Sequence, residues 1–165
     1  MVTDVVVAAQ HHDECKADHR FQSMLGGLRA EKELAKSEVR TRQETKISRQ
    51  RSGLPQGWRH EQMSVVLVTA EKVQGKLSCS DLALLIIGCS HGNGRNSFKH
   101  TDRILLQNVQ GSDSDILRQK AHDLFFIGRW EELIEETDIK FGPYVTAYLE
   151  ALERAADVQI SAEGH

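Results

Sequence analysis

Apolar residues recur every three or four positions along most of the second half of the chain, which is the spacing of an amphipathic helix. One such helix is predicted by Met63, Val66, Leu67, Ala70 and Val73. Gly75 ends it, as glycine commonly does. Only residues 5–9 and 65–69 show a pattern typical of a strand, and at 65–69 the longer helical period outweighs it. The chain therefore predicts a mostly α-helical protein.

The same reasoning predicts five further helices after residue 75, over about 78–88, 97–109, 112–127, 130–136 and from 143 onward. Ser78 is the expected N-cap of the first and Gly88 its stop. A glycine-rich loop separates it from the second. Gly142-Pro143 opens the last helix, since proline fits the first turn. Its expected core face consists of Tyr144, Val145, Tyr148, Leu149 and Leu152.

Residues 20–50 also predict a helix, although Gly26-Gly27 weaken its start. The segment from Arg51 to Gly57 contains two glycines and a proline and therefore marks a linker. We expect residues 1–57 to form a polar and basic, partly helical arm with a linker, and residues 58–160 to form a small helical domain. This domain would contain two units, residues 58–110 and 111–160.

Composition supports that division. Residues 11–62 hold 13 apolar side chains, too few to bury a core alone, whereas residues 63–160 hold 44. The net charge of −3 is unevenly spread. Ten basic residues face four acidic ones over 20–60, and five face twelve over 111–165. Because attraction to phosphate is local, an acidic chain with such a basic segment is compatible with a nucleic-acid partner.

Basic residues in the expected arm recur at four-residue spacing and then continue less regularly: Lys32, Lys36, Arg40, Arg42, Lys46, Arg49 and Arg51. One interpretation is an arm that contacts the phosphates of DNA. The other is a solvated helix face, balanced by Glu31, Glu33 and Glu38. The sequence leaves both open.

The expected unit at 111–160 carries anchors at helix-turn-helix spacing: Gly128, Leu133, Ile134, Val145, Tyr148 and Leu149. Ile134 follows Gly128 by six residues and precedes Val145 by eleven. This register resembles the response-regulator type of four-helix helix-turn-helix domain. That family usually has a small residue after the isoleucine, where this chain has Glu135. Glu150 and Glu153 on the following helix would also repel phosphate, so this unit is poorly suited to bind DNA.

The expected unit at 58–110 contains Gly75-Lys-Leu-Ser-Cys-Ser-Asp-Leu-Ala83, followed by Gly88-Cys-Ser90. These segments resemble the opening of a winged or repressor-type helix-turn-helix unit. The two units in tandem are also similar to an uncharacterised, transposon-associated bacterial family. Both resemblances imply a non-enzymatic DNA-binding protein, a transcriptional or mobile-element regulator. Gly92 and Gly94 fall where the recognition helix should begin, and the alternative is that both units are ordinary helical hairpins that pack a core.

Residues of this unit supply the donors that phosphates and base edges accept: Arg95, Asn96, Ser97, Lys99, His100 and Arg103. The candidate DNA contacts are therefore Arg95, Asn96, Lys99 and Arg103, together with Arg40, Arg42, Lys46, Arg49 and Arg51 of the arm. The expected partner is double-stranded DNA. The acidic C-terminal helices would serve packing or formation of a homodimer.

A competing hypothesis is a helical protein–protein adaptor. Residues 121–134 resemble part of a tetratricopeptide hairpin, although one partial copy cannot form such an array. Candidate partner contacts are Phe125, Phe126, Ile127 and Trp130. The acidic C-terminal region would suit a basic partner.

Catalytic and cofactor motifs are absent from the sequence. No phosphate-binding glycine motif or catalytic triad occurs, and we expect no enzyme activity and no cofactor. His12, Cys15 and His19 would share a helix face, and Cys79, Cys89, His91 and His100 could converge, but neither set has an established zinc spacing. We therefore expect no metal site. The odd number of cysteines and the short apolar runs favour a cytoplasmic protein without a membrane span.

Overall fold

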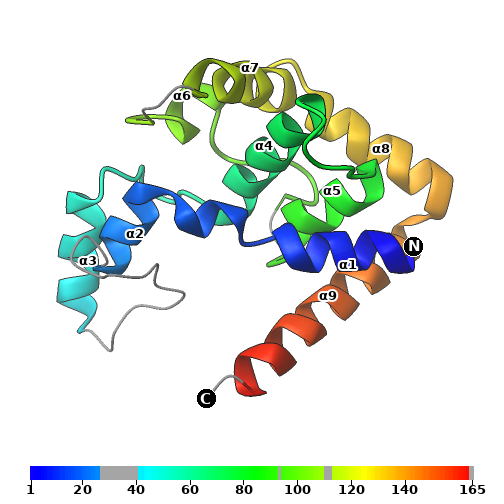
Figure 1. The fold of residues 1–165 in the computed structure, drawn as a ribbon, viewed down its shortest axis with the longest axis horizontal. Coiled ribbons are helices and arrows are strands. Elements are labelled where there is room, and N and C mark those ends of the chain that lie inside the picture. The colour runs from blue at the N-terminus through cyan, green and yellow to red at the C-terminus, as the bar shows by residue number, and fades with distance from the viewer. Residues whose placement is uncertain (27–40, 93, 110–112, 164–165) are drawn as a thin grey trace.

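The computed structural model describes residues 1–26, 41–92, 94–109 and 113–163, and within these ranges it contains helices and no strand. The mostly α-helical prediction is confirmed. The helices are α1 (Val2–His11), α2 (His19–Leu25), α3 (Arg42–Arg51), α4 (His60–Val73), α5 (Asp81–Cys89), α6 (Asp102–Leu105), α7 (Ser114–Phe125), α8 (Arg129–Phe141) and α9 (Pro143–Glu163), with a 3-10 turn, η1 (Glu14–Ala17), after α1 (Figure 1). None of the described helices combines the length and apolar character needed to cross a membrane.

Helices α4 and α5 form the centre of the fold. Every residue of α5 after Asp81 is buried, because α5 packs against α1, α4, α8 and α9. The continuous apolar run from Leu82 to Ile87 is therefore explained by a helix that is covered on nearly all sides. The segment at 65–69, which alone would predict a strand, lies inside α4, and residues 5–9 lie inside α1.

Gly88 is a contact residue rather than a helix stop. It lies inside α5, where a Cβ atom in place of its hydrogen would lie 2.3 Å from Cη2 of Trp130. The Trp130 ring is fully buried, and its Nε1 donates a 2.8 Å hydrogen bond to the carbonyl oxygen of Gly94. The predicted stop was wrong because the glycine makes room for this ring. The predicted N-cap was also wrong, since Ser80 rather than Ser78 accepts the bond from the Ala83 amide.

The N-terminal residues do not form an arm separate from the helical domain. Helix α1 packs against α5 and α9, and Ala8 and Cys15 have no exposed surface. The expected boundary at residue 57 therefore cuts through the core. Composition did not predict this packing, because a few apolar residues are enough when another element supplies the rest of the core.

The single helix expected over 20–50 does not form. Gly26, in the left-handed conformation (φ 94°), ends α2, and the Thr41–Glu44 capping box starts α3. The predicted break after Arg51 is confirmed, because α3 ends there and both Gly53 and Gly57 have positive φ. Lys32, Lys36 and Arg40 lie outside the described residues.

The region expected to contain the first recognition helix is mostly irregular. Instead of a helix over 97–109, only the single turn of α6 forms. Gly92 and Gly94 adopt positive φ, and the ring of Phe98 packs against Phe125 and Trp130 at centroid distances of 5.3 and 5.2 Å. Docking of Phe98 into the core thus holds the segment in a loop.

Three consecutive helices, α7, α8 and α9, form the last part of the fold. Gly128 caps α8 with φ 102°, and α8 extends to Phe141, beyond the expected end at residue 136. Leu133 and Leu149 are buried, as the anchor pattern predicted. The predicted core face of α9 was wrong in part, since three of its members point outward: Tyr144, Tyr148 and Leu152. Helix α9 turns Glu150 and Glu153 inward beside the correctly predicted Leu149.

Candidate nucleic-acid interface

Helix α3 carries four basic side chains, of which Arg42, Lys46 and Arg49 share one side of the helix, whereas Arg51 lies opposite them in the last turn. The helix packs against α2 at the left edge of Figure 1, and Ser48 Oγ donates a 2.6 Å hydrogen bond to the carbonyl oxygen of Met24. Ser48 is half-buried, and every other residue of α3 is exposed. Among the described residues, the capping box and the contact with α2 therefore hold α3 in place, and its other side chains are exposed.

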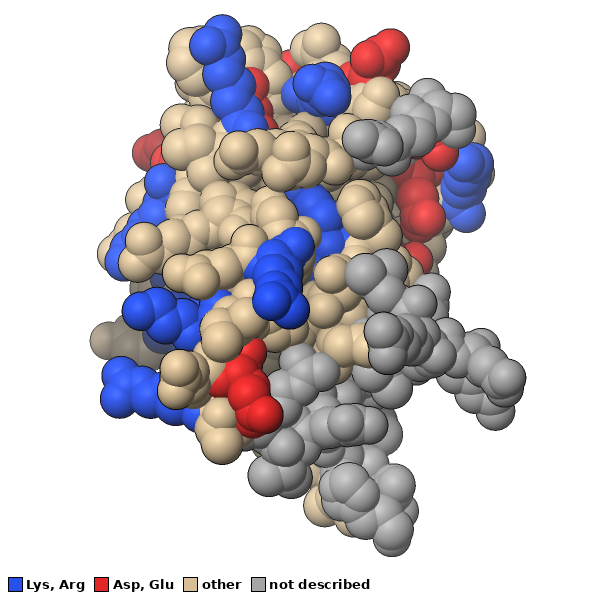
Figure 2. All heavy atoms as spheres, turned by 90° about the vertical axis from the view of Figure 1, so that its left-hand side faces the viewer, with Lys and Arg blue, Asp and Glu red and all other residues tan. Residues whose placement is uncertain are grey.

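Among the described residues, no acid forms an ion pair with the cations of α3, which are Arg42, Lys46, Arg49 and Arg51. The carboxylate of Glu44 is occupied by the capping box, where it accepts 2.8 Å hydrogen bonds from the Thr41 amide and hydroxyl. Figure 2 shows this side of the molecule, with Lys and Arg side chains spread over its left and centre and few acidic ones between them. We call Arg42, Lys46 and Arg49, taken together with Arg51 at the end of the helix, the basic helix face.

A small cation-lined hollow lies between the turn before α4 and the loop before α6. It has a volume of about 140 Å³ and is lined by Gly57, Arg59, Gln62, Gly94, Ser97, Phe98, Lys99 and His100. Gln62 Nε2 joins the two segments through a 2.8 Å hydrogen bond to the carbonyl oxygen of His100. Arg59 and Lys99 are exposed and form no ion pair among the described residues, and Nε2 of His100 is buried without a described hydrogen-bond partner. Two cations and a ring nitrogen at one hollow suit a phosphate group.

Arg20 ties the α6 segment to α2, the helix that carries α3. Its guanidinium is almost fully buried and donates to the carbonyl oxygens of Leu105 (3.1 Å) and Gln107 (2.6 Å), while Asp18 accepts at 2.6 Å on the other side. The Asn108 side chain adds a 3.3 Å bond to the carbonyl oxygen of Gly53, just after α3. These contacts hold α6, which carries the exposed Arg103, beside the end of α3.

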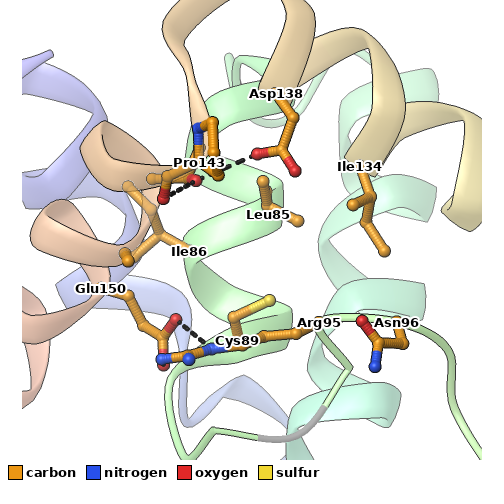
Figure 3. A pocket seen from close by; sticks show the side chains of 11 residues that line it. Leu85, Ile86, Cys89, Arg95, Asn96, Ile134, Asp138, Pro143 and Glu150 are labelled. Atoms are coloured by element: carbon orange, nitrogen blue, oxygen red, sulfur yellow. Dashed lines mark hydrogen bonds and ion pairs between the residues drawn. The ribbon is translucent and has the colours of Figure 1, made fainter.

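Arg95 and Asn96 lie elsewhere. Both line a pocket of about 240 Å³ between α5, α8 and α9 (Figure 3). Arg95 donates to both carboxylate oxygens of Glu150, and this hydrogen bonding raises the pKa of Arg95. A wider hollow that Arg95 and Asn96 also line contains Glu131, Glu135 and Asp138. The structure thus separates these two predicted DNA contacts, in acidic surroundings, from the basic helix face.

Sequence reasoning missed Arg59, which lies between Trp58 and the first residue of α4. An isolated arginine after a glycine turn carries no recognisable spacing with Lys99, forty positions later in the chain. The only available signal was the excess of basic residues over 20–60, to which Arg59 contributes.

An apolar face runs along the exposed side of α9. It consists of Tyr144, Ala147, Tyr148, Ala151, Leu152, Ala155 and Val158, all exposed. At 100° per residue these positions share one side of the helix, opposite Leu149 and Glu153, with no charged residue among them. Figure 1 shows the C-terminal half of α9 extending beyond the other helices. We call this the α9 apolar face.

The residues expected to contact a partner in an adaptor divide into two pairs. Trp130 is fully buried and Phe125 packs against it and Phe98, so both belong to the core. Phe126 and Ile127 are each 65% exposed. His122 stacks on the ring of Phe126 at 4.8 Å.

The three cysteines are free, buried thiols. Burial raises the pKa of Cys79 to about 11 and that of Cys89 to about 12, and it raises the pKa of Cys15 further. His19 is exposed while Cys15 is enclosed, so the set His12, Cys15 and His19 does not converge on one point.

Comparisons of the chain with models of known protein families, with curated proteins and with solved structures found no match.

Proposed function

We propose that this protein binds double-stranded DNA without catalysing a reaction, through the basic helix face and the hollow at Arg59 and Lys99, and that it serves as a transcriptional or mobile-element regulator. The observation that carries the proposal is a set of four cations on one exposed helix, none of them paired with a described acid. Glu44, the one acid within α3, is not three or four residues from any of these cations, which is the spacing at which helix ion pairs form.

The dimensions of α3 suit the major groove. Ten helical residues span about 15 Å, and a helix with side chains is about 10–12 Å wide, close to the groove width of about 12 Å. Gln43 and Gln50 are exposed on α3 and carry amides that can pair with adenine. Arg103 and the hollow would then contact backbone phosphates beside the groove. In this proposal the bases are contacted by α3, whereas the sequence predicted that residues 95–100 would contact them.

Fluorescence anisotropy with a labelled duplex tests the proposal. Replacing Lys46 and Arg49 by alanine should weaken binding at low salt at least about tenfold, because each lost phosphate contact reduces counterion release. The matched control replaces Lys72 and Lys140, which line a different hollow near Met1, and should leave the affinity unchanged. Equal losses in both variants would indicate attraction by net charge alone and would contradict a defined interface.

We also propose, on a separate observation, that the α9 apolar face pairs with α9 of a second copy. Alanines alternate with tyrosines and a leucine along it, which permits self-complementary packing of large into small side chains. An exposed apolar stripe of this length is typical of a contact surface. A protein adaptor would use the same face for a different partner.

Sedimentation velocity separates these outcomes. The wild type should sediment as a dimer at micromolar concentration, and Tyr148→Asp should sediment as a monomer. Ile139→Asp introduces the same charge at an exposed position of α8 outside the face and should remain dimeric. A monomeric wild type would contradict the homodimer.

A further inference from the structure

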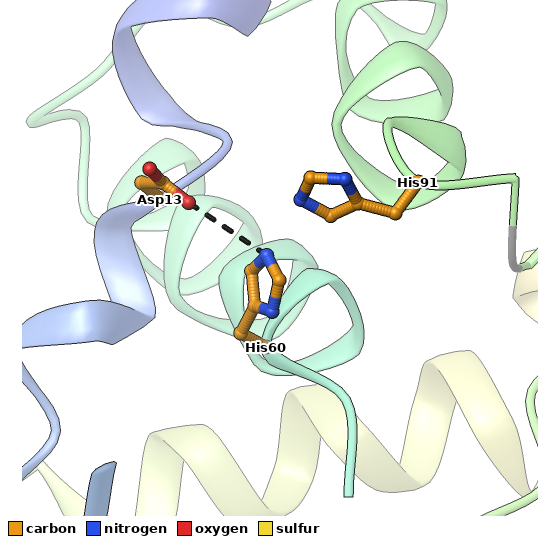
Figure 4. A group of neighbouring side chains, drawn as sticks. All are labelled: Asp13, His60 and His91. Atoms are coloured by element: carbon orange, nitrogen blue, oxygen red, sulfur yellow. Dashed lines mark ion pairs between the residues drawn. The ribbon is translucent and has the colours of Figure 1, made fainter. Parts of the chain in front are cut away.

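Three segments far apart in the sequence bring a carboxylate and two imidazoles together. Asp13 lies between α1 and η1, His60 is the first residue of α4, and His91 follows the end of α5 (Figure 4). Each offers one ligand atom, and these atoms all lie within 4.8 Å of one another. Asp13 Oδ1 is 3.7 Å from His60 Nε2, and the rings of His60 and His91 are 4.7 Å apart between centroids.

Two of the facing atoms are buried without a hydrogen bond. Oδ1 of Asp13 and Nε2 of His60 have no hydrogen-bond partner among the described residues and are closed to solvent. The other oxygen of Asp13 is engaged, 2.5 Å from Lys16 Nζ and 3.3 Å from His12 Nε2. Buried polar atoms are nearly always satisfied, so two that face each other across 3.7 Å point to a ligand that both of them bind.

The second nitrogen of His60 faces a carboxylate. Nδ1 lies 3.5 Å from Oε2 of Glu61, which is fully buried. A carboxylate behind a metal-binding imidazole fixes the tautomer and directs the lone pair of the other nitrogen toward the metal. His91 is exposed, so the third side of the cluster is open to solvent.

We propose that Asp13, His60 and His91 bind one divalent transition-metal ion, with Zn²⁺ the best fit to two imidazoles and one carboxylate, and with water in the remaining position. Bond lengths of about 2.0–2.1 Å in a tetrahedron separate ligand atoms by about 3.4 Å. The Asp13–His60 pair is already near that separation, and the ligand atom of His91 lies within 4.8 Å of both. The ion ties the start of α4 to η1 and to the end of α5. Arg59 directly precedes His60 and lines the cation-lined hollow. Metal binding to His60 therefore also restricts the motion of this side of the hollow.

The test uses the full chain after dialysis against a chelator. Zn²⁺ is titrated in competition with a chromophoric chelator, and Co²⁺ is added separately to read its visible absorption bands. We expect one Zn²⁺ per chain and Co²⁺ bands typical of four-coordination. His91→Ala should lower the Zn²⁺ affinity at least tenfold and abolish those bands. His19→Ala, which removes an exposed imidazole outside the cluster, should change neither.

Circular dichroism shows whether each variant keeps its helices, and the exposure of His91 makes loss of the fold unexpected. Should His91→Ala nevertheless unfold, His91→Gln provides a second comparison. Unchanged Zn²⁺ affinity in a folded His91 variant would place the ion at another His/carboxylate group, such as His11, Glu14 and Glu71, and would overturn the proposal. Absence of stoichiometric binding by the wild type would overturn it equally.

Discussion

Arg95 forms a two-point contact with Glu150, at 2.9 Å from Nε and 2.8 Å from Nη2. The carboxylate side chain is only 5% exposed, whereas the Arg95 side chain is 54% exposed. The arginine therefore reaches inward from the surface to neutralise an acid that α9 buries. This contact gives Arg95 a structural role in place of the phosphate contact that its position in the sequence predicted.

Arg95→Ala should destabilise the fold by about 1–3 kcal/mol, because it leaves the carboxylate of Glu150 buried without its donor. Urea unfolding measures the loss. Adding Glu150→Gln to the variant should restore part of the stability, since the uncompensated charge is then gone. Duplex affinity should stay near that of the wild type, and a loss as large as that of Arg103→Ala would contradict this assignment.

Gly88→Ala should destabilise the protein by about 1–3 kcal/mol through overpacking. The added methyl group would overlap Cη2 and Cζ2 of Trp130, at 2.3 and 2.7 Å, and would press on Val65. Thermal unfolding measures the effect. Gly75→Ala is the comparison, since its Cβ meets nothing within 4 Å and adds only left-handed backbone strain. A smaller loss at Gly88 than at Gly75 would show that the ring moves aside freely.

Glu153 should make stability fall as the pH rises toward neutrality. It is 1% exposed, and burial raises its pKa to about 7, against the opposing effect of His12, whose Nδ1 lies 3.5 Å away. The nearby acids Asp157, Asp13 and Glu150 raise it further. Since the folded state holds this proton more tightly than the unfolded chain, whose glutamate has a pKa of about 4.5, the cost of ionisation grows between about pH 4.5 and 7.

Glu153→Gln removes that ionisation. Relative to the wild type, the variant should gain on the order of 2–3 kcal/mol in free energy of unfolding between pH 4.5 and pH 8. Urea unfolding of both proteins at the two pH values provides the difference. A constant difference across the range would mean that Glu153 keeps its ordinary pKa in the folded protein.

Periodicity predicted those helices whose single apolar face decides their position. Helix α4, and the starts of α7 and α9, follow directly from spacing and caps. It predicted the glycine-rich loop before residue 97 but not its continuation over 97–101, because Phe98 docks against Trp130, a contact between residues that the sequence separates. It also misplaced Tyr148, since the inward face of α9 is set partly by the buried acids Glu150 and Glu153, which hydropathy assigns to solvent.

The candidate sites likewise include one that the sequence predicts and others that depend on tertiary packing. The basic residues of α3 are neighbours along the chain, so composition was enough to predict them. The pairing of Arg59 with Lys99, and the meeting of Asp13, His60 and His91, depend on how α4 and α5 pack. No spacing rule covers ligands drawn from three segments, and a sequence search for metal motifs therefore passes over them.

The salt dependence of duplex binding tests the central claim most directly. The logarithm of the association constant should fall linearly with the logarithm of the salt concentration, with a slope of about −0.9 for each phosphate contacted. Removing the basic helix face, by replacing Arg42, Lys46, Arg49 and Arg51 with alanine, should make the slope shallower by about 3–4, while the Lys72 and Lys140 control keeps the wild-type slope. An unchanged slope in the α3 variant, or no binding by the wild type at low salt, would contradict DNA binding through α3.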